Sequence, residues 1–119
     1  MTRFAGYAAI FDVPDRGGDI VCKGAFARTL GKAVPLCWQH DRSIAIGMIE
    51  TVAEDARGLR VIGRVDDRAV AVGQGLSFGY RVRTATQRTY RELYEVELIE
   101  ISLVTTPMQP LAVVHAVEP

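Results

Sequence analysis

The stretch Gly75-Leu76-Ser77-Phe78-Gly79-Tyr80 places a serine between two glycines inside an apolar, strand-like segment. Alternation along an extended strand puts Leu76, Phe78 and Tyr80 on one face and Ser77 on the other. The glycines remove side chains beside the serine, which lets another backbone or a bound molecule approach closely. A lone serine in such a strand is most often structural, so its meaning depends on what the remainder of the chain brings to it.

Short strand-like segments separated by Gly, Pro and Asp make up most of the chain. They span residues 4–13, 20–22, 34–39, 44–52, 59–65, 76–83, 90–104 and 111–117. A one- to two-turn helix is expected at residues 24–30, where Phe26 and Leu30 share a face, and a second at residues 66–73. The pattern predicts a mainly β (α+β) fold in one domain over residues 1–119: a small β-barrel of about seven strands, or an orthogonal sandwich.

Composition excludes several classes of protein. The 119 residues are 49% apolar, which is typical of a folded domain, and 14 basic residues balance 14 acidic ones. Without a basic surplus, nucleic-acid binding is not expected. The longest apolar runs fall short of a membrane span, and the amino terminus leads directly into strand-like sequence, so we expect a cytoplasmic protein.

The cysteines and histidines do not have metal-ligand spacing. Cys22 and Cys37 each lie in an apolar segment outside any CxxC pair. Two buried, reduced thiols are the preferred interpretation, and a disulfide between them stays open. Neither a metal nor a cofactor is expected.

His40 is the more suggestive of the two histidines. It ends the apolar segment at residues 34–39, so it is expected where a buried strand emerges toward solvent. An imidazole at such a rim can exchange protons. A surface histidine in a turn with Asp41 is an equally good interpretation from this stretch alone. His115, among the valines of the last segment, is more typical of a core or edge position.

A glutamate in the apolar stretch at residues 96–104 is a candidate partner for His40. Strict alternation fails near Ile99, and a β-bulge there would send Glu100 inward. A buried carboxylate is costly unless it is paired, and pairing with the His40 Nδ1–H would offset that cost. Glu97, with Glu95 behind it, is the competing candidate. Alternatively, all three are exposed charges of an edge strand.

Six stretches in order resemble the prohead (capsid maturation) serine proteases of tailed bacteriophages and phage-derived gene transfer agents, which share a fold with the herpesvirus assembly protease, assemblin. These stretches lie at residues 6–11, 18–21 with 24–26, 38–41, 58–61, 75–80, and 100–104 followed by Pro107. The resemblance runs from about Gly6 to Ala112. It implies a herpesvirus-protease-like β-barrel core with flanking helices.

The resemblance also implies an activity and a site. It makes the chain a serine endopeptidase with Ser77 as nucleophile, His40 as general base and Glu100, rather than Glu97, as the third group. Its substrates would be the scaffolding segment of the major capsid protein and the protease itself, by autocleavage. The expected setting is the procapsid shell in the bacterial cytoplasm, with self-association into a homo-oligomer and no nucleic acid or membrane partner.

The chain departs from the family pattern between the strand at residues 59–65 and the serine strand. Family members usually carry a longer segment there, often with a fuller helix, whereas only residues 66–74 are present here. A second hypothesis follows from this: a catalytically inactive, shortened relative that acts as an internal scaffold or capsid-binding module.

Overall fold

The computed structural model describes residues 1–66 and 69–119 and contains eight strands. Their bounds are β1 (Thr2–Ile10), β2 (Asp19–Val21), β3 (Val34–Trp38), β4 (Gly47–Glu54), β5 (Gly58–Val65), β6 (Gly75–Gln87), β7 (Arg91–Val104) and β8 (Val114–Glu118). The predicted strands are therefore present, with ends that differ by a few residues, and the mainly β prediction is confirmed.

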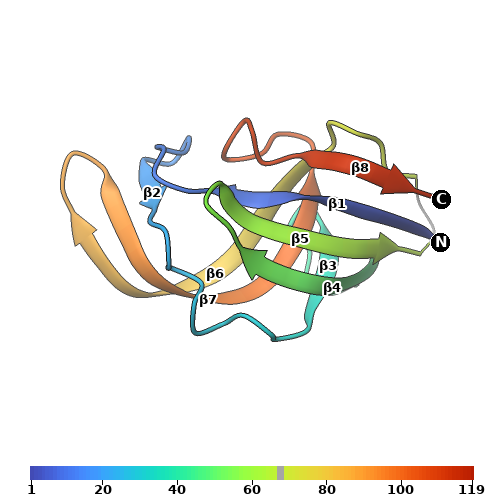
Figure 1. Cartoon of the computed structure of the whole chain (residues 1–119), viewed down its shortest axis with the longest axis horizontal. Helices are drawn as coiled ribbons and strands as arrows, with labels where there is room; N and C mark the ends of the chain where they lie inside the picture. The colour runs from blue at the N-terminus through green and yellow to red at the C-terminus, as the bar shows by residue number, and fades with distance from the viewer. Residues whose placement is uncertain (67–68) are drawn as a thin grey trace.

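All eight strands belong to one mixed sheet in the order β2-β7-β3-β4-β5-β1-β8, with β6 paired to β7. The pairs of β7 with β2 and with β3 are parallel, and the other pairs are antiparallel. β7 is the strand that pairs with three others: β6 lies along one of its edges, and β2 and β3 lie along the other. In Figure 1, β1, β4 and β5 form the front layer, and β6 and β7 cross behind them.

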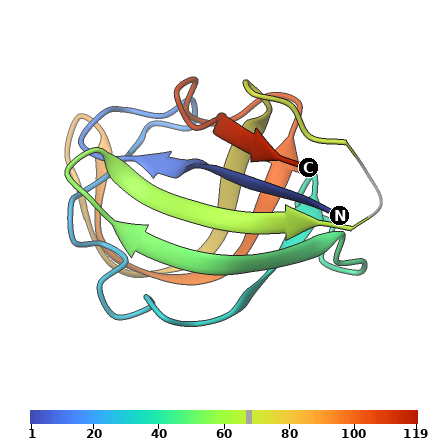
Figure 2. The same ribbon diagram turned by 45° about the vertical axis from the view of Figure 1, so that its right-hand side comes forward.

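The core lies between these two layers. Its largest fully buried side chains come from both layers and from the 24–30 segment; they include Phe26, Leu36, Leu59, Leu76, Leu93, Ile101 and Leu103. Figure 2, turned to bring the chain termini forward, shows β4 and β5 curving around this interior. Burial of these apolar side chains is the main favourable contribution to folding.

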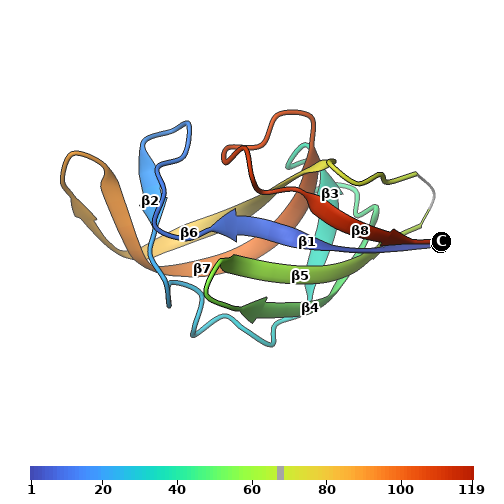
Figure 3. The same cartoon turned by 45° about the horizontal axis from the view of Figure 1, so that its top comes forward.

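The expectation of a closed barrel is wrong. Within the described residues, the start of β6 meets the segment just before β8 at an isolated bridge between Gly75 and Val113, and Leu76 N–H donates to the Ala112 carbonyl at 2.8 Å. Beyond this point β6 follows β7 instead of β8, and the two long strands form an arm that projects past β1, β4 and β5 (Figures 1 and 3). The sheet therefore stays open between β6 and β8.

The helix expected at residues 24–30 is a run of turns, so that prediction is wrong as well. The Ala25 carbonyl, which an α-helix would pair with the Thr29 N–H, accepts from the Val96 N–H of β7 instead, and the Thr29 N–H donates to the Phe26 carbonyl. The Phe26 N–H donates to the Glu54 carboxylate. The segment therefore binds the edge of β7 that lies between β2 and β3. Phe26 is fully buried, but Leu30 is 38% exposed, so the expected shared apolar face does not form.

The second expected helix, at residues 66–73, includes residues 67 and 68, which lie outside the described residues. The described part of that stretch contains no helix, and Gly73 N–H donates to the Val114 carbonyl. Across residues 1–66 and 69–119 the chain has no helix at all, so the flanking helices of the prediction are not observed.

Candidate active site

A tight turn at the end of β3 presents His40. Trp38 carbonyl accepts from Asp41 N–H at 2.9 Å, and the two residues between them, Gln39 and His40, have φ angles of 52° and 62°. Such left-handed backbone is unfavourable for residues other than glycine, by on the order of 1–3 kcal/mol each, and persists only where neighbours hold it. Here Gln39 N–H donates to the Leu103 carbonyl, which extends the β3–β7 pairing into the turn.

A β-bulge in β7 turns Glu100 inward, as the broken alternation near Ile99 predicts. Gly79 pairs with Glu100, but the next residue of β6, Tyr80, pairs with Leu98, so Ile99 is the extra residue. Glu100 is fully buried, in contrast to an ordinary edge-strand charge. The bulge therefore places a carboxylate inside the molecule next to the end of β3.

The Glu100 carboxylate is paired on both oxygens. Oε1 lies 2.7 Å from His40 Nδ1 and accepts from the Ser102 hydroxyl at 2.7 Å. Oε2 lies 3.8 Å from Arg42 Nε. Burial raises the pKa of this carboxyl, but the hydrogen bonds from His40 and Ser102, with the charges of His40 and Arg42, outweigh burial and hold the pKa below its usual value. Glu100 is therefore an ionised group that can orient the imidazole.

Ser77 and His40 line the same pocket, whose volume is about 250 Å³. Its other lining residues are Gln39, Val104, Thr105, Thr106 and Met108. Ser77 is 6% exposed, whereas the His40 side chain is 40% exposed, so the hydroxyl lies at the inner wall and the imidazole at the rim. Ser77 also pairs in register with Ser102 of β7, two residues from Glu100.

The loop that follows β7 forms another wall of the pocket and is held at both ends. Gln39 Oε1 accepts from Thr105 N–H at 2.8 Å. Further along, the buried Gln109 side chain accepts from Ile10 N–H at 2.8 Å and donates to the Ile10 carbonyl at 2.7 Å. These contacts fix the loop between the His40 turn and the end of β1.

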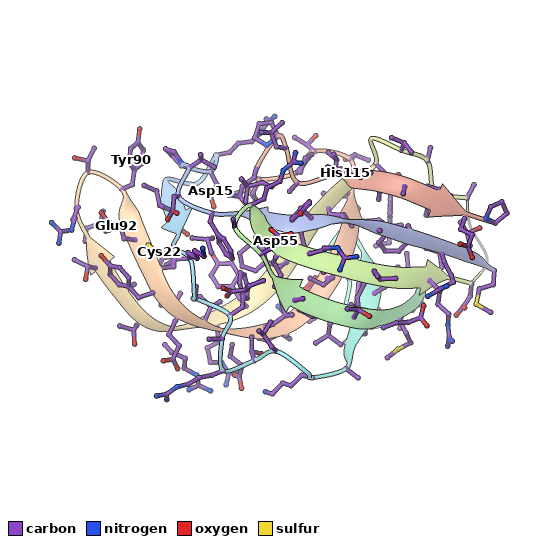
Figure 4. The ribbon with its side chains drawn as sticks, in the orientation of Figure 1. Asp15, Cys22, Asp55, Tyr90, Glu92 and His115 are labelled. Carbon is purple, nitrogen blue, oxygen red and sulfur yellow. The ribbon has the colours of Figure 1, made fainter. Side chains whose placement is uncertain are left out.

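The other acidic candidates and the second histidine lie elsewhere. Glu97 forms surface ion pairs with Lys32, Arg81 and Arg83. Glu95 lies 3.8 Å from Arg28. His115 is on β8 (Figure 4), where its ring packs against Tyr7 with 5.4 Å between centroids. The geometry thus separates Glu100 from its competitors, a choice that residue patterns alone leave open.

Both cysteines are free thiols in the structure. Cys37 is buried in β3 beside the site, and burial together with the Glu100 charge raises the pKa of its thiol. The reactive thiolate is therefore scarce at Cys37, which makes it a poor alternative nucleophile.

The described residues contain no group of three or more His, Cys, Asp or Glu side chains that could hold a metal ion. No helix among them has the length and apolar character to cross a membrane.

Sequence reasoning missed three residues of this site: Gln39, Arg42 and Ser102. Gln39 and Arg42 flank His40 in the sequence, so the signal was their proximity to a candidate base. Ser102 follows Glu100 by two residues, and alternation places both side chains on one face of β7. That spacing was visible in the sequence, but a small hydroxyl inside an apolar strand is usually unremarkable.

Comparison with known proteins identifies the family. The model of the caudovirus prohead serine protease family matches residues 1–118. The chain belongs to this family. A prohead protease of Enterobacteria phage HK97 is 28% identical over 136 aligned residues, which cover 97% of this chain and 60% of the phage protein.

The chain thus spans about 60% of the length of that phage relative. In its fold the chain is similar to the KSHV protease, solved with a hexapeptide phosphonate inhibitor: the TM-score is 0.70 at 11% identity, over 99% of this chain and 65% of the viral one. The expected likeness to a herpesvirus protease fold is therefore confirmed, although the sheet is open and the described residues have no helix.

Proposed function

We propose that the chain is a serine endopeptidase in which Ser77 is the nucleophile, His40 the general base and Glu100 the group that orients His40. One observation carries the proposal: His40 Nδ1 is 2.7 Å from a fully buried Glu100 carboxylate, and the same histidine lines a pocket with Ser77. Membership of the prohead serine protease family supports it.

The proposed reaction follows from these positions. In the neutral imidazole, an Nδ1–H donated to Glu100 leaves Nε2 without a proton, so that Nε2 can accept one. His40 takes the Ser77 proton as the hydroxyl attacks a peptide carbonyl, and the imidazolium then protonates the leaving amine. The ionised Glu100 stabilises the imidazolium, and water completes the cycle by hydrolysing the acyl-enzyme with His40 again as base.

Backbone N–H groups of the loop after β7 are the proposed stabilisers of the oxyanion. Thr105 and Thr106 line the pocket beside Ser77. The Thr105 N–H is already donated to Gln39, so we assign the role to the Thr106 N–H. Donors of this kind contribute by stabilising charge that develops only in the transition state.

The proposed substrates are the scaffolding segment of the major capsid protein and, by autocleavage, the protease itself. We place the reaction inside the procapsid, in the cytoplasm of the bacterial host, with the enzyme self-associated. The support is the family match and the similarity to a phage prohead protease. High local concentration inside a shell would favour both self-association and cleavage in trans.

Two experiments test the activity. A peptidyl or alkyl phosphonate probe that reacts with activated serines should label the wild-type protein at Ser77, and Ser77→Ala should abolish labelling while thermal unfolding is unchanged. In co-expression with the cognate capsid protein, the wild type should shorten the capsid protein and Ser77→Ala should not. Capsid processing by Ser77→Ala at the wild-type rate would overturn the nucleophile assignment.

The alternative is an inactive relative that binds the shell as a scaffold, and it is motivated by the short connection from β5 to β6. That connection does not remove any of the proposed catalytic residues, because the turn after β3 supplies His40, and β6 and β7 supply Ser77 and Glu100. The probe separates the hypotheses: a scaffold stays unlabelled and still co-purifies with capsid protein, whereas the enzyme is labelled.

A further inference from the structure

One buried hydroxyl joins the main chain of the proposed base to the side chain of the proposed orienting group. The Ser102 Oγ accepts a hydrogen bond from the His40 backbone N–H at 3.1 Å and donates one to Glu100 Oε1 at 2.7 Å. Oε1 is the same oxygen that lies 2.7 Å from His40 Nδ1. The three groups form a closed ring of contacts in which Ser102 touches both ends of the histidine–glutamate pair.

The place of Ser102 in the sheet explains why it can make both contacts. In β7 it pairs in register with Ser77 of β6 on one side and with Cys37 of β3 on the other. It is fully buried, and its side chain shares a face with that of Glu100 two residues earlier. Ser102 therefore lies between the strand that carries the nucleophile and the strand that leads to the base.

The His40 turn requires such support. Both Gln39 and His40 have positive φ, a conformation that costs free energy and would relax without partners. The Gln39 N–H is held by the Leu103 carbonyl, and the His40 N–H is held by Ser102. The second bond involves the backbone of the proposed base itself, so it holds the main chain from which the imidazole extends.

We propose that Ser102 is a positioning residue for the reaction: its hydroxyl fixes the His40 turn and the Glu100 carboxylate relative to each other, so that the imidazole faces Ser77. This inference rests on the proposed function of the site. Ser102 takes no proton from substrate and forms no bond to it. Its effect is on the fraction of time that the pair spends in the productive geometry.

Ser102→Ala tests the proposal in the full chain, with a phosphonate probe and a peptide substrate. We expect kcat to fall by about 10- to 100-fold, because small displacements of a general base are costly, with KM little changed. The acid limb of the kcat/KM profile should move to higher pH, since the carboxylate loses a donor that stabilises its ionised form. Ser102→Thr, which keeps the hydroxyl, should restore most of the rate.

Thr29→Val is the matched control. Thr29 is also buried, and its hydroxyl also accepts a backbone N–H, that of Leu98 in β7, at 3.1 Å. The variant loses a buried hydroxyl of the same kind away from the pocket. It should lower stability without moving kcat or the pH profile, which separates positioning from general destabilisation.

Hydrogen exchange provides a readout that does not depend on turnover. In Ser102→Ala the His40 amide should exchange faster, whereas the Gln39 amide, held by Leu103, should keep its protection. Wild-type protein that is never labelled by the probe overturns the proposed function, and the positioning role with it. A labelled wild type whose Ser102→Ala variant keeps the wild-type kcat, pH profile and His40 amide protection overturns the positioning role alone.

Discussion

The carboxylate of Glu100 occupies the space that a side chain at Gly79 would fill. The two residues pair in register across β6 and β7. A Cβ built on Gly79 would lie 2.6 Å from the Glu100 carboxyl carbon and 2.9 Å from a terminal nitrogen of Arg42. Gly79, the second glycine of the Gly75–Tyr80 stretch, therefore makes room for the proposed orienting carboxylate. The sequence had suggested that a bound molecule or another backbone would approach this glycine.

Gly79→Ala should consequently damage the site more than the fold. The added methyl group has to displace the Glu100 carboxylate from His40 or push β6 away from β7. We expect a fall in phosphonate labelling of about 10-fold or more, because the imidazole loses its orienting partner. The overpacking should reduce the free energy of unfolding by about 1–3 kcal/mol. Labelling kinetics and urea unfolding, measured on the same preparation, check both numbers.

Thr84→Ala provides the comparison for this variant, because Thr84 is an exposed residue of the same strand. It should label at the wild-type rate. If Gly79→Ala labels as fast as Thr84→Ala, the carboxylate does not need its present position, and Glu100 has no orienting role.

Glu100→Gln separates the charge of the third group from its shape. The amide oxygen can still accept from His40 Nδ1–H, but it does not provide the negative charge that stabilises an imidazolium. We expect kcat to fall by on the order of 100-fold with little change in KM. Steady-state kinetics on a peptide substrate provide the measurement.

Glu97→Gln is the informative companion, because residue patterns leave Glu97 and Glu100 as competing candidates. Glu97 is engaged in surface ion pairs with Lys32, Arg81 and Arg83, which are worth little individually. Its variant should keep the wild-type kcat. The reverse result, with Glu97→Gln slow and Glu100→Gln normal, would contradict the assignment.

The sequence predicts local features of this protein better than it predicts closure of the sheet. The loss of apolar–polar alternation at Ile99 predicts the bulge, because the extra residue of a bulge interrupts the two-residue repeat of side-chain direction along a strand. Whether β6 pairs with β8 depends instead on the direction that β6 takes after its first residues. Residues 81–87 of β6 are mostly exposed and follow β7 into the arm. No local pattern encodes that choice.

The 24–30 segment illustrates a second limit. Phe26 and Leu30 have helical spacing, yet the Ala25 carbonyl, which a helix would pair with the Thr29 N–H, accepts a tertiary hydrogen bond from the Val96 N–H. The same holds for Ser102, whose importance comes from two partners that are 2 and 62 residues away in the chain. Residue spacing does not predict hydrogen bonds between groups that only the tertiary fold brings together.

The contact between Asp19 and Arg91 ties β2 to the end of the arm that is next to the β6–β7 turn, and it predicts how stability varies with pH. Asp19 accepts two hydrogen bonds from Arg91, at 2.8 and 2.9 Å, and one from the Tyr80 hydroxyl at 3.1 Å. The hydrogen bonds from Arg91 lower the pKa of Asp19, burial raises it, and the hydrogen bond from Tyr80 lowers it further. The net result is a pKa below the ordinary value of 3.8. Burial and the Asp19 charge also raise the pKa of Tyr80 to about 12, so the phenol stays a neutral donor.

Asp19→Asn should therefore lower the free energy of unfolding at pH 7 by about 1–3 kcal/mol, since a partly buried guanidinium loses its carboxylate. Because the folded-state pKa is depressed, this stabilisation is complete above the ordinary pKa of an aspartate and is lost as the pH falls through the folded value. The difference between wild type and Asp19→Asn should shrink steadily below about pH 4. Urea unfolding at a series of pH values measures this difference in the free energy of unfolding. The control is Asp12→Asn, because Asp12 is exposed and asparagine tolerates its φ of 63°. A difference that stays constant from pH 7 to pH 2.5 would mean that the Asp19–Arg91 contact does not stabilise the fold through the charge of the carboxylate.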